Sequence, residues 1–92
     1  MTSTTVQTSH IMDSVIELRK RIKEVLTRVA QEIARQRLVE LSGLRLSYVV
    51  SDAVQIFFLE LSGKSSTEDA LDVAYQKIYS DIEQLIKKGL IC

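Results

Sequence analysis

The sequence contains no proline, asparagine or tryptophan, and its single cysteine is the last residue, Cys92. One cysteine excludes a framework of internal disulfides. The missing asparagine, beside many isoleucine, valine, lysine and glutamate residues, is a feature of proteins from heat-adapted organisms. The longest aliphatic and aromatic run covers residues 56–59, and the opening residues lack the charged-then-apolar pattern of a secretion signal. We therefore expect an intracellular, cytoplasmic protein with no membrane span.

Neither sign of charge predominates, because twelve basic residues balance twelve acidic ones. Net charge therefore predicts no attraction to nucleic acid or to an anionic membrane. The charges are nevertheless unevenly placed. Eight basic against five acidic residues give +3 over residues 1–45, and four against seven give −3 over residues 46–92. This distribution suits packing of one half on the other, or a subunit with one basic face.

The length and composition indicate one domain with a hydrophobic core. The chain has 92 residues, of which 46% are hydrophobic and 26% charged, and this composition excludes wholesale disorder. Residues 1–10 are polar and aperiodic, and they are expected to form a disordered tail. The remaining residues, 11–92, are expected to form a single helical domain.

A long amphipathic helix is predicted over residues 12–42. Its apolar residues recur at alternating steps of four and three, as in a heptad seam. The members of this seam are Ile11, Val15, Leu18, Ile22, Val25 and Val29. A second set, formed by Leu26, Ala30, Ile33, Ala34, Leu38 and Leu41, widens the apolar stripe. Gly43 is expected to take the left-handed position that ends the helix, with Leu44 folding back as its hydrophobic contact.

The segment 44–62 allows two interpretations. Alternation over 44–50 is typical of a strand, whereas the apolar spacing from Val50 to Leu61 follows a helix. Because residues 51–53 lack the glycine or asparagine of a tight hairpin turn, a helix over 47–62 is favoured. Its apolar residues lie on nearly every side, which predicts that this helix is the most buried one.

A third helix is predicted over residues 66–88. Ser65 and Glu68 fit a capping box, and Gly89-Leu90 fits a glycine-terminated helix end. The similar strings at 39–43 and 59–63, Val-Glu-Leu-Ser-Gly and Leu-Glu-Leu-Ser-Gly, are interpreted as one helix stop used twice.

These elements predict an all-α fold, an antiparallel three-helix bundle or hairpin with a long first helix, a short buried second helix and a long third helix. The first helix is longer than its partners can cover. Its seam is therefore expected to contact another chain, either a larger protein subunit or a second copy in a homodimer.

Two groups of residues are candidates for binding. The apolar and aromatic candidates for a protein partner are Val15, Leu18, Ile22 and Tyr79. The candidates for DNA or an acidic partner are Arg21, Arg28 and Arg35, which recur every seven residues, with Lys20 and Lys23 beside them. The alternative for these cations is a solvated helix face with carboxylates one turn away. Of Phe57 and Phe58, at least one is expected in the core.

No catalytic set, metal site or cofactor site is recognisable. The acidic residues lack histidine or cysteine partners at the spacing of metal ligands, and His10 has no second histidine. The protein is therefore expected to be no enzyme and to bind no cofactor.

Residues 17–22, Glu-Leu-Arg-Lys-Arg-Ile, resemble the opening of the all-helical chorismate mutases. The resemblance implies a dimer joined through the long first helix, with arginines gathered in an active site. Arg19 and Arg28 would be the nearest counterparts. The acidic alternation and the lysine that follow in that family have no clear counterpart here. A small dimeric enzyme of this type, or a nucleic-acid-binding helical dimer, is thus the alternative hypothesis.

In size, lack of proline, neutral charge and polar opening, the whole chain resembles the small helical accessory subunits of crenarchaeal family-B replicative DNA polymerase holoenzymes. The resemblance rests on no diagnostic motif. It implies a non-catalytic accessory subunit that binds a polymerase chain and supports DNA replication.

Overall fold

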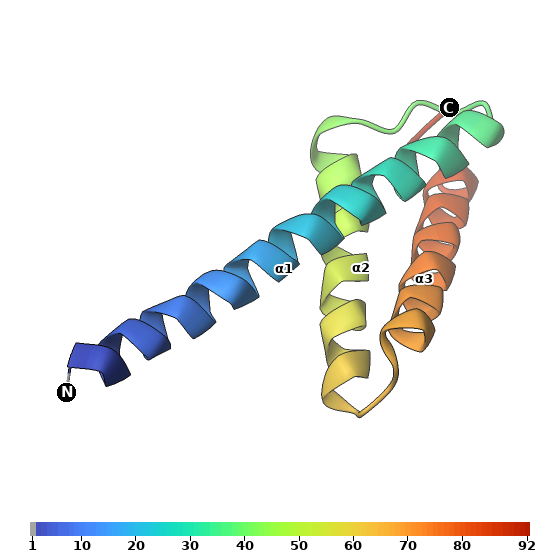
Figure 1. Ribbon diagram of the computed structural model, residues 1–92. Helices are drawn as coiled ribbons and strands as arrows, with labels where there is room; N and C mark the ends of the chain where they lie inside the picture. Colours follow the sequence, from blue (N-terminus) through green and yellow to red (C-terminus); the bar gives the residue numbers. More distant parts are fainter. Residues whose placement is uncertain (1) are drawn as a thin grey trace.

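Three α-helices and short connections make up the computed structural model (Figure 1). The backbone is described from residue 2 and the side chains from residue 14 to residue 92. The helices are α1 (Thr2–Gln36), α2 (Gly43–Ser62) and α3 (Thr67–Lys87). No strand occurs among residues 2–92, so the all-α prediction is confirmed and the strand interpretation of 44–50 is excluded. The tail expected at residues 1–10 lies outside the residues described with their side chains and stays a prediction.

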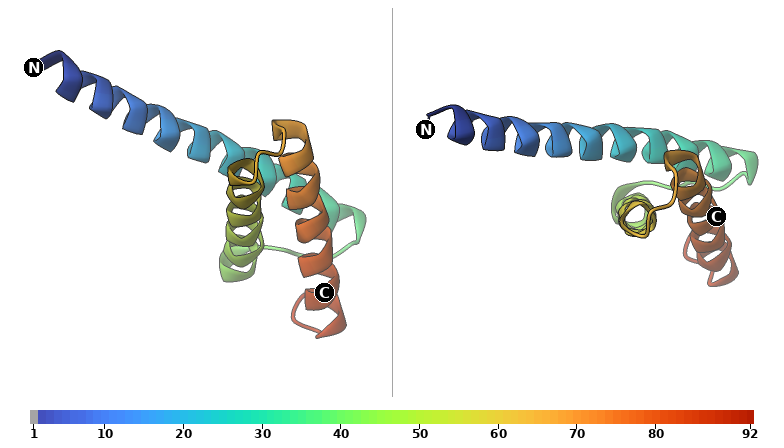
Figure 2. Two further views of the ribbon diagram at one scale, coloured as in Figure 1. Left: turned by 90° about the horizontal axis from the view of Figure 1, so that it is seen from below. Right: turned by 60° about the horizontal axis from the view of Figure 1, so that its bottom comes forward.

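The second and third helices form an antiparallel hairpin, and α1 lies across one face of it (Figures 1 and 2). The right-hand view of Figure 2 looks along α2 and shows α1 passing over both helices of the hairpin. The C-terminal half of α1 crosses the hairpin, whereas its N-terminal half extends beyond it. The arrangement is thus a helix laid obliquely over a hairpin, and this crossing determines which apolar side chains of α1 are covered.

The hydrophobic core lies where the three helices meet. Its largest fully buried side chains are Phe57, Leu26, Ile78, Ile82 and Val49. Four fully buried alanines complete the contact, and their small side chains let the helix backbones approach closely. They are Ala30, Ala53, Ala70 and Ala74. Among the side chains described, the buried stripe of α1 begins at Ile22, and residues 14–21 are exposed.

The first helix ends six residues earlier than its apolar pattern predicts. Leu38 takes the left-handed backbone conformation, with a φ of 58°, and the amides of Leu38 and Val39 donate to the carbonyls of Arg35 and Ala34. This hydrogen-bond pattern is the helix end that was expected at Gly43. A non-glycine residue there costs about 1 kcal/mol. Burial of Leu41 in the following loop offsets that cost, and the prediction of helix over 37–42 is wrong.

The repeated string of five residues does not act as a repeated helix stop. At its first occurrence it forms the loop and the start of α2, because Ser42 precedes the helix and Gly43, with a φ of 61°, is its first residue. At its second occurrence it ends α2, with Lys64 in the left-handed conformation and Gly63 at a φ of −81°. The two strings therefore have different structures, and packing of the neighbouring residues decides between them.

The third helix agrees most closely with its prediction. Its cap is Ser66, whose hydroxyl accepts a hydrogen bond from the amide of Asp69. Ser65 instead donates to Glu60, so the capping residue lies one position later than expected. At the other end Gly89 has a φ of 70°, and Leu90 donates to the carbonyl of Leu85, as the sequence predicts.

The second helix is less enclosed than its composition suggests. It has four buried residues, against six on α3, so it is not the most buried helix. Leu44, Tyr48 and Leu59 are exposed on it. The reason is geometric, because α2 has α1 on one side and α3 on another, and nothing among the described residues covers its outer side.

Candidate functional site

The N-terminal half of α1 exposes apolar side chains. Val15 is 56% exposed and Leu18 is 44% exposed, and Val25 continues the row at 41%. We call Val15, Leu18 and Val25 the exposed seam. The sequence predicts such an uncovered stretch from the length of the helix, and the side chains lie as it predicts. Ile11, the first residue of the predicted heptad pattern, lies outside the residues described with their side chains.

One of the residues predicted to bind a partner belongs instead to the protein's own core. Ile22 is 8% exposed and packs with Leu26 in the buried cluster. Val29, later in the same heptad pattern, is partly buried against that cluster. The hairpin therefore covers only part of the pattern. Ile22 packs inside and Val29 is partly buried, whereas Val15, Leu18 and Val25 face solvent. Sequence periodicity alone cannot locate that division.

The arginine row of α1 lies on its outer side. Arg21, Arg28 and Arg35 are all exposed, as are Lys20 and Lys23. Two of the three arginines have carboxylates one helical turn away. Arg21 lies 3.6 Å from Glu17 and Arg35 lies 3.2 Å from Glu32, in pairs of a kind that contributes little at the surface. The row is thus partly neutralised along its own helix.

The aromatic side chains divide between core and surface. Phe57 is fully buried, and Phe58 is partly buried against it, with ring centroids 5.1 Å apart and an edge-to-face angle of 86°. Tyr75 packs against the core from α3, as expected. Tyr79, one turn later, is 48% exposed and remains accessible to a partner.

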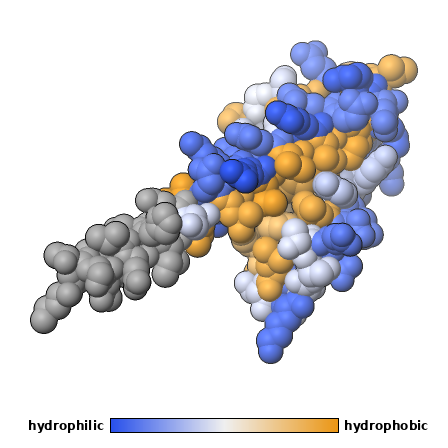
Figure 3. Space-filling view, in the orientation of Figure 1, coloured by the Kyte–Doolittle hydropathy of each residue, from blue (hydrophilic) through white to orange (hydrophobic). Residues whose placement is uncertain are grey.

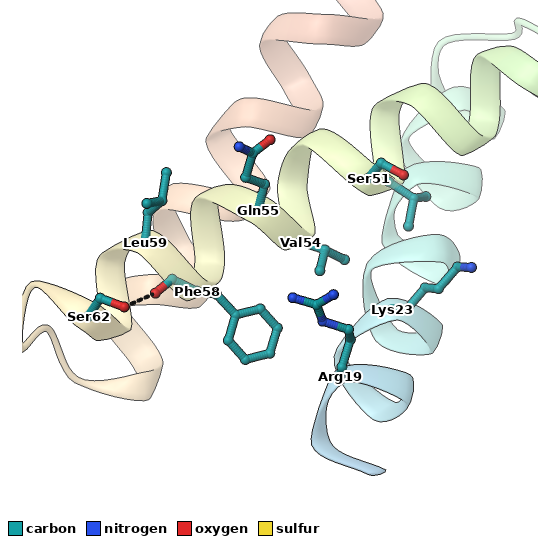
Figure 4. Close-up of a pocket in the computed structure, with 9 residues that line it drawn as sticks. Arg19, Lys23, Ser51, Val54, Gln55, Phe58, Leu59 and Ser62 are labelled. Atoms are coloured by element: carbon teal, nitrogen blue, oxygen red, sulfur yellow. Dashed lines mark hydrogen bonds between the residues drawn. The ribbon is translucent and has the colours of Figure 1, made fainter. Parts of the chain in front are cut away.

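A groove that the sequence analysis did not predict lies between α1 and α2 (Figure 4). It has a volume of about 560 Å³. Two cations from α1 line it, together with an apolar floor and polar side chains from α2. The lining residues are Arg19, Lys23, Val50, Ser51, Val54, Gln55, Phe58, Leu59 and Ser62. None of these residues is acidic, so the groove combines positive charge with an apolar surface.

The guanidinium of Arg19 is held over the ring of Phe58. Its central carbon lies 5.4 Å from the ring centroid, and Figure 4 shows the side chain reaching from α1 toward Phe58 and Val54. Stacking on an aromatic face leaves the N–H groups in the guanidinium plane free to donate. Neither Arg19 nor Lys23 forms an ion pair with any residue of the range 14–92. The groove therefore contains two positively charged side chains, Arg19 and Lys23, whose charges no described carboxylate neutralises.

Sequence analysis missed this groove because its walls are far apart in the chain. Arg19 begins the basic run of residues 19–23, and the resemblance to chorismate mutases makes Arg28 its companion. The two are nine residues apart, which is two and a half turns of helix, so their side chains leave α1 on opposite sides. They do not converge on one pocket within a single chain.

A buried carboxyl lies between α2 and α3. Asp81 is 6% exposed, with Asp52 and Lys77 as its charged neighbours, and Lys77 lies 3.4 Å from Asp81 and 3.5 Å from Asp52. Burial, a hydrogen bond with Asp52 and the charge of Asp52 together raise the pKa of Asp81 to about 6, against the opposing effect of Lys77. The buried Oδ2 of Asp81 has no hydrogen-bond partner. When it is protonated, the carboxyl of Asp81 can donate a hydrogen bond to the carboxylate of Asp52.

The raised pKa predicts a stability that depends on pH. Below pH 4 Asp81 is protonated in both folded and unfolded chains, and between about pH 4 and 6 the folded chain binds more protons. The free energy of unfolding should therefore fall as pH rises through this window, and level off above it. Asp81→Asn should remove that fall and add about 1–2 kcal/mol at pH 7. Urea unfolding at several pH values measures both effects.

The control for this prediction is Asp72→Asn on the exposed side of α3. That variant should keep the slope of the wild-type protein between pH 4 and 6. An equal slope in wild type and Asp81→Asn would show that folding does not raise the pKa of Asp81, and the prediction would be wrong.

Other kinds of site find no support in the described part of the chain. No group of three or more histidine, cysteine, aspartate or glutamate side chains that could hold a metal ion occurs there. Across that same part, the helices are too short or too polar to cross a membrane. The thiol of Cys92 is exposed and free.

The two surfaces that remain are the exposed seam and the groove, and both depend on α1. They are suited to binding, since each presents side chains that no other described residue covers. Comparison with protein-family models, with curated proteins and with solved structures found no match to this chain.

Proposed function

We propose that this protein is a non-catalytic interaction subunit that docks onto a larger protein through the exposed seam of α1. The observation that carries the proposal is the apolar row of α1, which stays exposed at Val15, Leu18 and Val25 although the hairpin covers Ile22. An apolar row of this kind gains free energy when a partner removes it from water. Figure 3 shows hydrophobic residues gathered where α1 crosses the hairpin, with hydrophilic residues above them on α1.

The more specific proposal is a role as an accessory subunit of a DNA polymerase holoenzyme. Its support is the resemblance in size, neutrality and helical character, together with the outward-facing row of Arg21, Arg28 and Arg35. That row fits a neighbouring phosphate backbone or an acidic partner surface, and such contacts weaken steeply with salt. The enzyme alternative has less support, because Arg19 and Arg28 lie on opposite sides of α1.

The proposal predicts that one charge in the seam disrupts the complex. The tagged full-length protein is purified from its own cells, its companion is identified, and the purified pair is titrated. Leu18→Glu should weaken binding by about 100-fold, because it places a carboxylate in a desolvated contact. The matched control is Leu44→Glu, the same change at an exposed leucine of α2 outside the seam, and it should bind like wild type.

Salt separates the apolar contact from the basic row. The double variant Arg21→Gln and Arg28→Gln should reduce the dependence of affinity on salt and leave the binding at high salt unchanged. If Leu18→Glu binds the companion normally, the docking proposal fails. If sedimentation instead finds wild type dimeric and Leu18→Glu monomeric, then a second copy occupies the seam in place of a larger protein.

A further inference from the structure

The groove between α1 and α2 is a second surface, separate from the exposed seam. The seam is a row of aliphatic side chains, whereas the groove combines two cations with an apolar floor. Arg19 and Lys23 are one helical turn apart, which places their attachment points about 6 Å apart along α1. Ile16, exposed and three residues before Arg19, extends the same face of α1 with an apolar side chain.

The charge of the groove is uncompensated. Among its described lining residues the only charged groups are Arg19 and Lys23, both positive. The opposite wall, from α2, contributes neutral polar groups at Ser51, Gln55 and Ser62. The hydroxyl of Ser62 already donates to the carbonyl of Phe58, so Gln55 is the free side-chain amide of that wall. A ligand that fills this groove must therefore bring its own negative charge.

The position of Arg19 makes it ready to bind a carboxylate. Its contact with the ring of Phe58 holds the guanidinium at the groove before any ligand arrives, which reduces the ordering cost of binding. A guanidinium held in this way can donate two parallel hydrogen bonds to one carboxylate. The ammonium group of Lys23 supplies a positive charge for a second carboxylate of the ligand. The apolar surface formed by Val54 and Phe58 suits an aliphatic side chain between the two acids.

Nucleic acid fits these features less well. Binding of single strands relies on open aromatic faces on which bases stack. The only aromatic residue lining the groove is Phe58, and Arg19 already lies over its ring. The rest of the floor is aliphatic. A peptide with carboxylates and aliphatic side chains matches both the charge and the floor.

We propose that the groove of Arg19, Lys23 and the outer face of α2 binds a short acidic segment of a partner protein, with two carboxylates about one helical turn apart and an aliphatic anchor between them. Such a segment neutralises both cations and covers Val54. This site does not depend on the exposed seam, so the protein can hold a partner at two places. The proposal stands or falls independently of the docking role of Leu18.

The test uses the full chain and a defined probe. The probe is a fluorescein-labelled helical peptide with two glutamates four residues apart and a leucine between them, measured by fluorescence anisotropy. A peptide with glutamines in place of the glutamates is the negative probe. Arg19→Ala should weaken binding of the acidic peptide by about 10–100-fold, because a charge-assisted, two-pronged contact is lost.

Substitutions at Gln55 keep the test independent of folding and of the stacking on Phe58. Gln55 is exposed, so a charged side chain there leaves the core untouched. Gln55→Lys should tighten peptide binding about threefold, and Gln55→Glu should weaken it by a similar factor. The matched controls are Gln76→Lys and Gln76→Glu, on the exposed side of α3, which should both bind like wild type.

Three results would overturn the proposal. The first is a wild-type protein that binds the acidic peptide no better than the glutamine peptide. The second is an affinity that responds equally to the Gln55 and Gln76 variants, which would show attraction to overall charge. The third is a single-stranded oligonucleotide that binds more tightly than the peptide with the same sensitivity to Gln55, which would make the groove a nucleic-acid surface. Leu18→Ala, which introduces no charge beside Arg19, should leave peptide binding within about twofold of wild type.

Discussion

Phe57→Ala is expected to destabilise the protein by about 3–5 kcal/mol, a large part of the stability of a domain of this size. Phe57 is fully buried at the junction of the three helices, and its ring meets that of Phe58 edge to face. Removing it deletes most of its apolar contacts and leaves a cavity that rigid helices cannot close. Urea or thermal unfolding followed by circular dichroism measures the loss.

A matched aromatic control separates burial from side-chain type. Tyr79→Ala removes a ring of similar size from a position that is 48% exposed, and it should cost less than about 1 kcal/mol. If Phe57→Ala lowers the free energy of unfolding by less than about 1 kcal/mol, then Phe57 lies at the surface. The packing described for the core would then be wrong.

The second large effect compares two leucines of one helix. Leu26→Ala should cost about 3–5 kcal/mol, because Leu26 is fully buried where α1 crosses the hairpin. Leu18→Ala, the same substitution eight residues earlier, should cost less than about 1 kcal/mol, because Leu18 is 44% exposed. Unfolding curves of the two variants under one set of conditions give both values.

This comparison also bears on function. If the two substitutions cost the same, Leu18 is part of the protein's own core and is not available to a partner. If Leu18→Ala barely changes the free energy of unfolding but weakens a complex, then the exposed seam is a binding surface. The experiment thus distinguishes a structural role of the early heptad positions from a docking role.

The sequence predicts the helices better than their ends and their contacts. Apolar spacing identifies three helices because it reports which face of each segment avoids water. It overestimates α1, since Leu41 stays apolar and buried after the helix has ended at Gln36. The glycine signal also gives a wrong prediction at Gly43. This glycine has a positive φ, but it starts a helix instead of ending one.

The candidate site could be predicted only in part. The uncovered stretch of α1 follows from helix lengths, so Val15 and Leu18 are found from sequence. Whether Ile22 faces solvent or the hairpin depends on where the helices cross, and no local pattern encodes that point. The groove combines Arg19 with Phe58, thirty-nine residues away in the sequence, and its recognition requires the angle between α1 and α2.

The hairpin of α2 and α3 has a consequence for the order of folding. The two helices are joined by residues 63–66, so their mutual contacts close short loops, which form rapidly. The C-terminal half of α1 can then dock onto a surface that already exists. Residues 14–21 of α1 are exposed, so their side chains contribute little to either step. These amino acids are therefore free to change with the demands of a partner while the rate at which the chain folds stays the same.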